Sequence, residues 1–143
     1  MSVLSNQQFP GIIFENSNNQ RSNMPEKIYI VDDDESVCRA LKTLLMTYDF
    51  EVTTFNSGKE FFDTVALEDP GCLLLDIHLP GLDGWEIQRR ILDSGSKRSV
   101  IFISAEKLDN AADRALKVGA VGFLQKPVHA QTLVDLIIVS SKK

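Results

Sequence analysis

Short apolar runs alternate with helix-like patterns along most of the chain. The runs are four to six residues long. The run at 50–55 contains β-branched and aromatic side chains, which are typical of strands, and the run at 72–75 is apolar without alternation, as expected for a central parallel strand. They cover residues 28–31, 50–55, 72–75, 100–103 and 121–125. A helical pattern follows each run. The chain therefore contains five predicted βα units, which indicate a parallel sheet with helices on both faces.

The segments after these runs carry several kinds of helix signal. In the first, apolar residues recur at the spacing of one helical face: Val37, Ala40, Leu41, Leu44, Leu45 and Tyr48. Ser57 and Glu60 predict a capping box for the second helix, and residues 85–92 predict the third. Asp109 is the predicted cap of a fourth helix that Gly119 ends. The fifth helix, residues 130–140, is more apolar than one buried stripe requires, which favours a surface for a partner.

The first part of the chain differs from the rest. Residues 1–26 are rich in Asn, Gln and Ser, carry few charges and offer only one short apolar cluster, residues 11–14. Such a composition buries too little apolar surface to offset the entropy of ordering the chain. The sequence predicts a disordered or loosely docked N-terminal extension.

Polar side chains stand where the predicted strands end. Asp32 and Asp33 follow the first run, Asp76 the third, Ser104 the fourth and Lys126 the fifth. In an open parallel sheet, ligands bind at the carboxyl ends of the strands, where the strand order reverses. We therefore expect these five residues to form one site.

The three acids in this set point to metal and phosphoryl chemistry. Carboxylates brought close together repel one another, and such a cluster usually holds a cation. Mg²⁺ suits oxygen ligands and commonly binds one or two carboxylates together with phosphate. A carboxylate can also attack phosphorus and form an aspartyl-phosphate, provided that positive charge such as that of Lys126 and the metal offsets the phosphoryl group. Ser104 offers a hydroxyl donor to a phosphoryl oxygen.

Each of these residues also has an ordinary structural explanation. The acids at 32–34 could cap the first helix, and Asp76 could cap its loop. Ser104 alone could be a turn residue, and Lys126 alone a solvated lysine. Their joint placement at four strand ends favours a functional site over these separate explanations.

Charge and cysteine content narrow the function classes. The formal net charge is −5 and the pI is near 5.0, so no basic field favours direct binding of nucleic acid or of an anionic membrane. No apolar run has the length of a membrane span, and no signal peptide is recognisable. Cys38 and Cys72 stand outside any CxxC motif, which favours a reducing, cytoplasmic location. His78 and His129 lack a second ligand at zinc spacing, so no zinc site is predicted.

Four motifs together resemble the receiver domain of two-component response regulators. They are IVDD at 30–33, LDIHLPGLDG at 75–84, ISA at 103–105 and FLQKP at 123–127. The resemblance predicts one receiver domain over residues 27–143. It implies an α/β fold, a (βα)5 doubly wound parallel five-stranded sheet in the flavodoxin-like order 2-1-3-4-5. The stretch GWEIQRR at 84–90 further resembles the nitrogen-fixation type of regulator, whose members usually continue into a helix-turn-helix output domain.

The resemblance implies a role for each acid of the site. Asp76 matches the phosphoacceptor. Asp33 matches a direct Mg²⁺ ligand, and Asp32 matches a ligand that acts largely through water. The backbone carbonyl of His78 matches the third protein ligand. The implied metal set is therefore Asp32, Asp33, Asp76 and the His78 carbonyl, with Mg²⁺ as the cofactor.

Other positions match residues that bind the phosphoryl group or respond to it. They are Ser104, Ala105, Lys126 and the aromatic switch residue Phe123. A phenylalanine lacks the hydroxyl of a tyrosine, so a rotamer change there would act through packing. Pro127 matches a proline that typically follows a cis peptide bond. His78 and Glu106 match positions that tune the lifetime of the phosphoryl group in the family.

By the same resemblance, the phosphoryl donor is a sensor histidine kinase or a histidine-phosphotransfer protein. Phosphorylation would change the face built from the fourth helix, fifth strand and fifth helix, which would bind an output partner or a second copy. The chain is thus expected to be a signalling phosphoacceptor and not an enzyme.

Two alternatives remain open at this point. Residues 28–36 also fit the strand-DxDx pattern of haloacid-dehalogenase-like phosphatases, with Asp32 as nucleophile and Asp34 as general acid. The other alternative is a pseudo-receiver, an interaction module that keeps the fold without phosphorylation.

Overall fold

The computed structural model describes residues 26–105 and 110–141 of the chain. Its strands are β2 (Lys27–Val31), β3 (Glu51–Phe55), β4 (Cys72–Asp76), β5 (Ser99–Ser104) and β6 (Gly122–Gln125). The helices between and after them are α1 (Glu35–Met46), α2 (Gly58–Thr64), α3 (Gly84–Asp93), α4 (Ala111–Lys117) and α5 (Ala130–Ser141). All five predicted βα units are present, and their boundaries lie within a few residues of those predicted. Residues 1–25 of the predicted extension lie outside the described residues.

The described strands form one parallel sheet in the order β3-β2-β4-β5-β6. Ranked along the chain, these strands give the order 2-1-3-4-5, which confirms the flavodoxin-like topology. The order reverses beside β2, because the chain moves outward to β3 and then returns to the other side for β4. That reversal places the carboxyl ends of β2 and β4 next to each other, where such sheets bind ligands.

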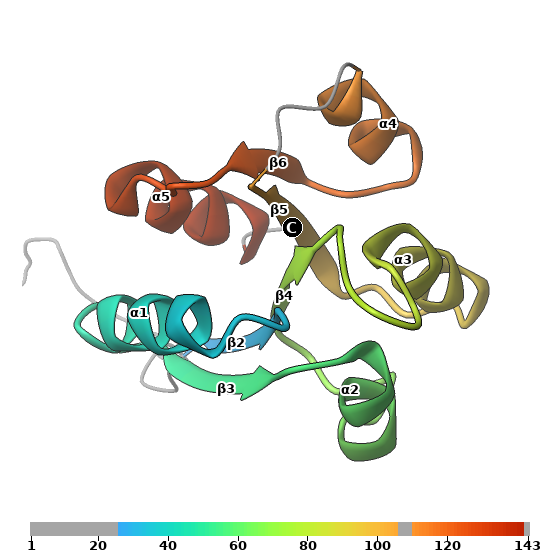
Figure 1. Ribbon diagram of the computed structural model, residues 1–143, viewed down its shortest axis with the longest axis horizontal. Helices are drawn as coiled ribbons and strands as arrows, with labels where there is room; N and C mark the ends of the chain where they lie inside the picture. Colours follow the sequence, from blue (N-terminus) through green and yellow to red (C-terminus); the bar gives the residue numbers. More distant parts are fainter. Residues whose placement is uncertain (1–25, 106–109, 142–143) are drawn as a thin grey trace, which may run out of the picture.

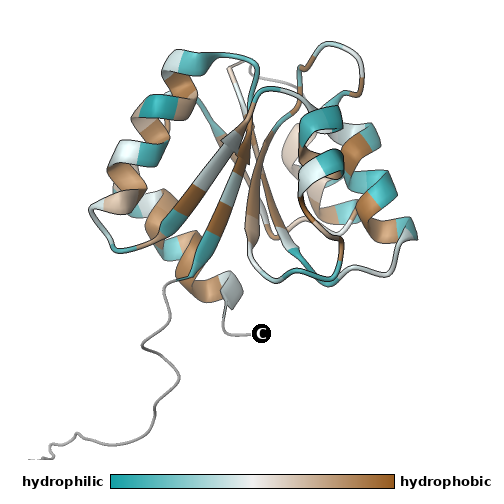
Figure 2. Cartoon of the chain, turned by 90° about the horizontal axis from the view of Figure 1, so that it is seen from below, coloured by the Kyte–Doolittle hydropathy of each residue, from teal (hydrophilic) through white to brown (hydrophobic). Residues whose placement is uncertain are grey.

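Helices cover the sheet in two layers (Figure 1). α1 and α5 lie on one face, and α2, α3 and α4 lie on the other. Each layer packs on the sheet to form a separate hydrophobic core. Leu45 of α1 and Ile137 of α5 belong to one buried cluster, and Phe61 of α2 and Ile91 of α3 belong to the other. Figure 2 shows the sheet between the two helix layers, with apolar residues in brown on the strands and on the helices.

The buried side of α1 is the predicted one at Leu41 and Leu45, with Val37 and Leu44 partly buried, but it departs from the prediction at two positions. The structure buries Cys38, Leu41 and Leu45, whereas Ala40 and Tyr48 are exposed. The buried residues follow one another at three and four positions, which is the spacing of one helical face, and Ala40 falls beside that face. Tyr48 falls beyond the last helical residue, Met46.

Three helices begin with the side-chain caps that their sequences favour. Asp34, Ser57 and Asp83 each accept a hydrogen bond from a backbone N–H in the first turn of α1, α2 and α3. At α2, the Glu60 carboxylate accepts from the N–H of Asn56, one residue before the cap. The N-cap position of α4 is Asn110, with a φ of 63° and no side-chain cap bond. Asp109, the predicted cap, lies outside the described residues.

The apolar surplus of α5 divides between core and surface. Leu133, Val134 and Ile137 are buried, whereas Ile138 and Val139 are 42% and 64% exposed. Among the described residues, none of the helices has the length and apolarity needed to cross a bilayer.

Candidate functional site

The strand register brings the predicted site residues to one edge of the sheet. Val31 of β2 pairs with Leu75 of β4, so Asp32 and Asp76 follow the same paired position. Asp76 in turn pairs with Ile103 of β5, the residue before Ser104. Ser104 pairs with Gln125 of β6, the residue before Lys126, and the Lys126 N–H donates to the Ser104 carbonyl at 2.7 Å. Four stretches that are distant in sequence thus end side by side.

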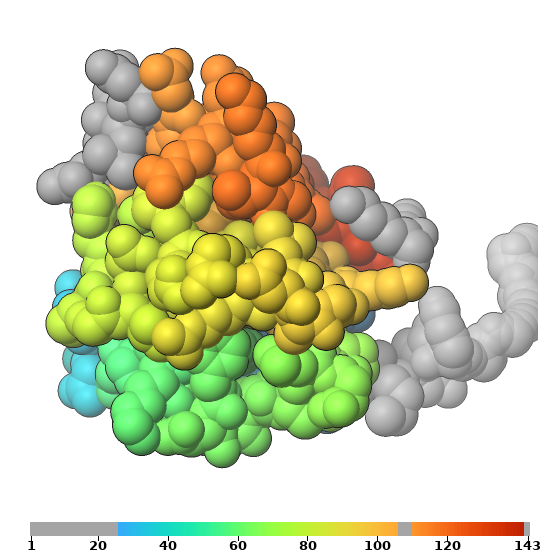
Figure 3. Space-filling model, turned by 90° about the vertical axis from the view of Figure 1, so that its right-hand side faces the viewer, coloured from blue at the N-terminus to red at the C-terminus, as the bar shows by residue number. Residues whose placement is uncertain are grey.

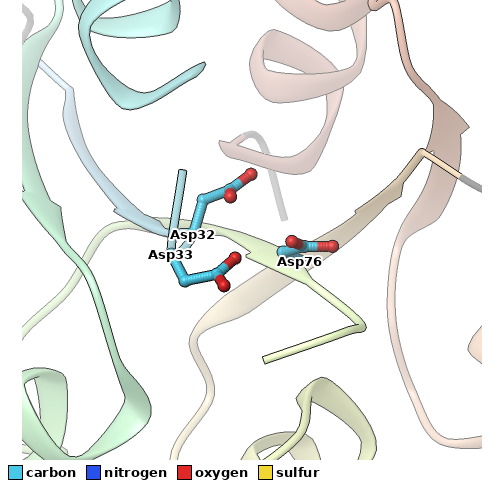
Figure 4. Close-up of side chains that lie close together, drawn as sticks. All are labelled: Asp32, Asp33 and Asp76. Carbon is cyan, nitrogen blue, oxygen red and sulfur yellow. The ribbon is translucent and has the colours of Figure 1, made fainter. Parts of the chain in front are cut away.

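Three carboxylates meet at this edge (Figure 4). One oxygen from each of Asp32, Asp33 and Asp76 lies within 4.8 Å of the others. Asp32 is fully buried and Asp76 is 5% exposed, whereas Asp33 is exposed. Backbone N–H groups hold the two buried acids: that of Asp34 donates to Asp32 Oδ1 at 3.0 Å, and that of His78 donates to Asp76 Oδ1 at 3.4 Å.

Lys126 provides the positive charge of the site. Its Nζ donates to Asp32 Oδ2 at 2.7 Å and lies 3.6 Å from Asp76 Oδ2. Burial alone would lower the pKa of Lys126, but the hydrogen bond and the attraction to Asp32, together with the attraction to Asp76, raise the pKa above its ordinary value. Lys126 therefore remains an ammonium group at neutral pH, between two acids.

The carboxyl of Asp76 has a raised pKa. Burial raises its pKa to about 6, and the neighbouring charge of Asp32 adds to the rise, while Lys126 and the His78 N–H oppose it. The group is thus mostly ionised at pH 7.5, and its charge is held in a poorly solvated place. A carboxylate in such a place is a stronger nucleophile than one that is fully hydrated.

The remaining predicted residues differ in burial. Ser104 is fully buried at the end of β5, and Ala105 follows it on the surface. Phe123 is half-buried on β6 and packs against the core cluster on the side of α2, α3 and α4. His78 has an exposed side chain. The Lys126–Pro127 peptide bond is cis. Glu106 lies outside the described residues.

Two supporting residues were not predicted from the sequence. Asn56 Nδ2 and Cys38 Sγ each lie 3.3 Å from the backbone carbonyl oxygen of Asp32, and both donate to it. Asn56 follows β3, so the rule that polar residues gather after parallel strands could have identified it. Cys38 gave no such signal, because it lies within α1. Together they fix the backbone that carries the buried acid.

The acidic run at 32–34 serves both as part of the acidic cluster, through Asp32 and Asp33, and as a helix cap, through Asp34. Asp34 caps α1 and accepts hydrogen bonds from Ser36 Oγ and from two backbone N–H groups. The Ser36 bond is the main cause of a lowered pKa at Asp34. A carboxyl that is ionised and held as a cap is poorly suited to be the proton donor that a haloacid-dehalogenase-like mechanism requires.

The donor set fits a hard divalent cation. Three carboxylates and one ammonium leave a net charge of about −2 when all are ionised, and that charge is confined to a partly buried place. The candidate ligand atoms are carboxylate oxygens, which Mg²⁺ prefers. Neither His78 nor His129 belongs to this cluster.

Comparisons with known proteins identify the family of this fold. The family model of the response regulator receiver domain matches residues 28–138. The response regulator protein TmoT of Ectopseudomonas mendocina is 33% identical over 135 residues, which cover 94% of this chain and 60% of TmoT. The transcriptional regulatory protein FixJ of Bradyrhizobium diazoefficiens is 34% identical over 110 residues, 77% of this chain and 54% of FixJ.

Solved structures show the same relationship. The response regulator StyR superposes with a TM-score of 0.77 at 35% identity, over 83% of this chain and 60% of that one. The structure titled FixJ-N gives a TM-score of 0.76 at 28% identity, over 83% of this chain and 95% of that one. The chain spans 60% or less of the curated relatives described above, and its likeness to FixJ makes the nitrogen-fixation-type subgroup plausible. Because the family model covers most of its length, this chain belongs to the response regulator receiver family.

Proposed function

We propose that Asp76 accepts a phosphoryl group from a phosphohistidine of a sensor kinase or a histidine-phosphotransfer protein. The chain is a phosphoacceptor receiver domain of two-component signalling, and such domains interact with histidine kinases and output domains. One observation carries the assignment to Asp76. Its carboxylate is nearly buried, yet it shares the carboxyl edge of the sheet with two further acids and the Lys126 ammonium.

The transfer is a substitution at phosphorus. A carboxylate oxygen of Asp76 forms a bond to phosphorus while the phosphorus–nitrogen bond of the donor breaks. The electron pair of that bond stays on the nitrogen of the departing imidazole. Asp76 enters the reaction ionised above its pKa of about 6, so no base is needed to activate it.

Lys126 and the end of β5 stabilise the negative charge of the group in transfer. The Lys126 ammonium lies 3.6 Å from the Asp76 carboxylate. An oxygen of a phosphoryl group on Asp76 would be within its reach. Ser104 would donate its hydroxyl to a second phosphoryl oxygen, and the backbone N–H of Ala105 would donate to a third. Binding of the phosphoryl group in this way would draw the start of the β5–α4 connection toward Asp76.

Asp32, Asp33, Asp76 and the His78 carbonyl would hold Mg²⁺, which supplies positive charge next to the phosphoryl oxygens when bound. Receiver domains bind Mg²⁺ at an acidic pocket of this kind. Asp32 remains tied to Lys126 in the described structure, which suits a ligand that acts through water.

The surface that would report phosphorylation lies on α4, β6 and α5. Leu116 of α4 is 60% exposed, and Ile138 and Val139 of α5 are also exposed. These exposed side chains give α4 and α5 apolar area that a partner could bury. We propose that an output partner or a second copy of the chain binds there after phosphorylation.

Acetyl phosphate and Mg²⁺ test the function directly. The wild-type protein should gain the mass of one phosphoryl group by intact mass spectrometry, and Asp76→Asn should gain none. Asp49→Asn is a matched control, because Asp49 has a φ of 67°, a conformation that asparagine also adopts. Equal labelling of Asp76→Asn would contradict the assignment. A phosphoryl group mapped to Asp32 would favour the phosphatase alternative.

Mg²⁺ should stabilise the folded protein if the acids bind it. At about 100 times its Kd, a ligand specific to the folded state adds about 2.7 kcal/mol to the free energy of unfolding. Thermal unfolding in EDTA and in excess Mg²⁺ measures this gain for the wild type and for Asp33→Asn, whose exposed side chain belongs to the acidic cluster. We expect most of the gain to be lost in Asp33→Asn and retained in Asp49→Asn. A wild type that does not respond to Mg²⁺ would favour the pseudo-receiver.

A further inference from the structure

α3 contacts α4 through two polar interactions. Gln88 is 2% exposed, and its Nε2 donates at 2.8 Å to the carbonyl oxygen of Val118, the C-cap of α4. The guanidinium of Arg114, in the middle of α4, lies 4.0 Å from the ring centroid of Trp85. Figure 3 shows α3 and α4 side by side on this face of the molecule. α4 is therefore held by α3 at two points.

The start of α3 is built directly on the backbone of Asp76. The Gly84 N–H donates to the Ile77 carbonyl at 2.8 Å. A Cβ at Gly84 would lie 2.5 Å from the Asp76 carbonyl oxygen and 2.8 Å from Ile77 Cα, so only glycine allows this approach. Trp85 is the next residue, and the centroid of its ring lies 4.7 Å from that of Phe102 of β5. Few atoms therefore separate the phosphoacceptor backbone from the side chains that hold α4.

We propose that α3 is a second link between Asp76 and α4, in which Trp85 and Gln88 are positioning residues for α4. The Trp85–Arg114 contact is made in the arrangement described here and is weakened when α4 shifts after phosphorylation. This rests on the proposed function, in which the Asp76 phosphoryl group changes the face that contains α4. A contact made in only one of two arrangements biases the equilibrium by the free energy of that contact.

Removing the contact should therefore favour the shifted arrangement before any phosphoryl group is bound. A cation–π pair at an exposed position changes such an equilibrium by about two- to five-fold. By linkage, any ligand that binds the shifted arrangement gains affinity by the same factor. Simple loss of stability would not increase the affinity for such a ligand.

The experiment measures the binding of beryllofluoride, a phosphoryl mimic, in Mg²⁺ by following the amide NMR signals of α4. Arg114→Gln should bind it about two- to five-fold more tightly than Lys117→Gln, which removes the same charge from the same helix. The α4 signals of unliganded Arg114→Gln should also lie on the line between the free and bound wild-type positions. Trp85→Phe, which keeps a ring against Phe102, should shift the affinity in the same direction.

The outcomes separate this inference from the function on which it rests. Equal or weaker binding by Arg114→Gln, in a protein that still binds beryllofluoride, would overturn the α3 link alone. A wild type that binds no beryllofluoride in Mg²⁺ would overturn both the link and the proposed function.

Discussion

Replacing Lys126 by methionine is expected to slow phosphoryl acceptance from acetyl phosphate by about 100- to 1,000-fold, the usual effect of losing one preorganised charge donor. Methionine approximates the unbranched alkyl part of lysine and lacks the ammonium that lies 2.7 Å from Asp32 and 3.6 Å from Asp76. The negative charge of the group in transfer then faces the acids without this compensation. The rate of mass increase, measured at fixed Mg²⁺, gives the effect.

Two further variants make this result interpretable. Lys59→Met removes a surface ammonium that pairs with Asp63 on α2, and it should react like the wild type. Lys126→Arg keeps the charge, but the planar guanidinium cannot reproduce the short contact of a compact ammonium, so its rate should be intermediate. Lys126→Met that is folded and reacts at the wild-type rate would contradict the role assigned to Lys126.

Asp76→Asn is expected to stabilise the folded protein at pH 7.5 in EDTA, by about 3 kcal/mol at most. The folded pKa of Asp76 is about 6, against an ordinary value of 3.8, and each unit corresponds to about 1.4 kcal/mol. Because the pKa is raised, the folded state holds this proton more tightly than the unfolded state. The ionised group therefore lowers stability as pH rises from about 4 to 6, and the full loss persists above pH 6.

Urea unfolding of the wild type and of Asp76→Asn at several pH values tests this sign. The difference in the free energy of unfolding should be largest at pH 7.5, should fall steeply between pH 6 and pH 4, and should vanish below about pH 3, where Asp76 is protonated in both states. Asp49→Asn, at an exposed turn, controls for the general effect of removing a carboxylate. An Asp76→Asn protein less stable than the wild type at pH 7.5 would show that the carboxylate is stabilised where it lies.

The sequence was sufficient to predict the fold and the edge of the sheet where the polar residues gather. The five polar residues of the site, Asp32, Asp33, Asp76, Ser104 and Lys126, come at the ends of apolar runs, and in a parallel sheet all such positions lie at the same edge. Ser104 is an example. It follows Ile103, the β5 residue that pairs with Asp76, and therefore lies at the same edge as Asp76. Helix caps were similarly predictable at Ser57, because cap preferences depend on local sequence alone.

Contacts between side chains from distant stretches could not be predicted in this way. Lys126 donates to Asp32 across 94 positions of sequence, and it lies farther from Asp76. Which acid is nearer depends on side-chain directions that periodicity does not contain. The exposure of Ala40 has a similar cause, because an apolar residue at the margin of a helical stripe is buried only if a neighbouring element covers it.

The shared register of the strands makes the chemistry of this domain depend on the length of its strands. Asp76 lies beside Asp32 because each follows a paired position, and side chains along a strand alternate between faces. Deleting one residue from β4 would turn the nucleophile toward the opposite layer even though every acid remained in the chain. An insertion in the connection between α2 and β4, by contrast, leaves the pairing of β4 with β2 and β5 unchanged. Length variation is therefore tolerated in the connections, whereas the strands can vary in composition but not in length.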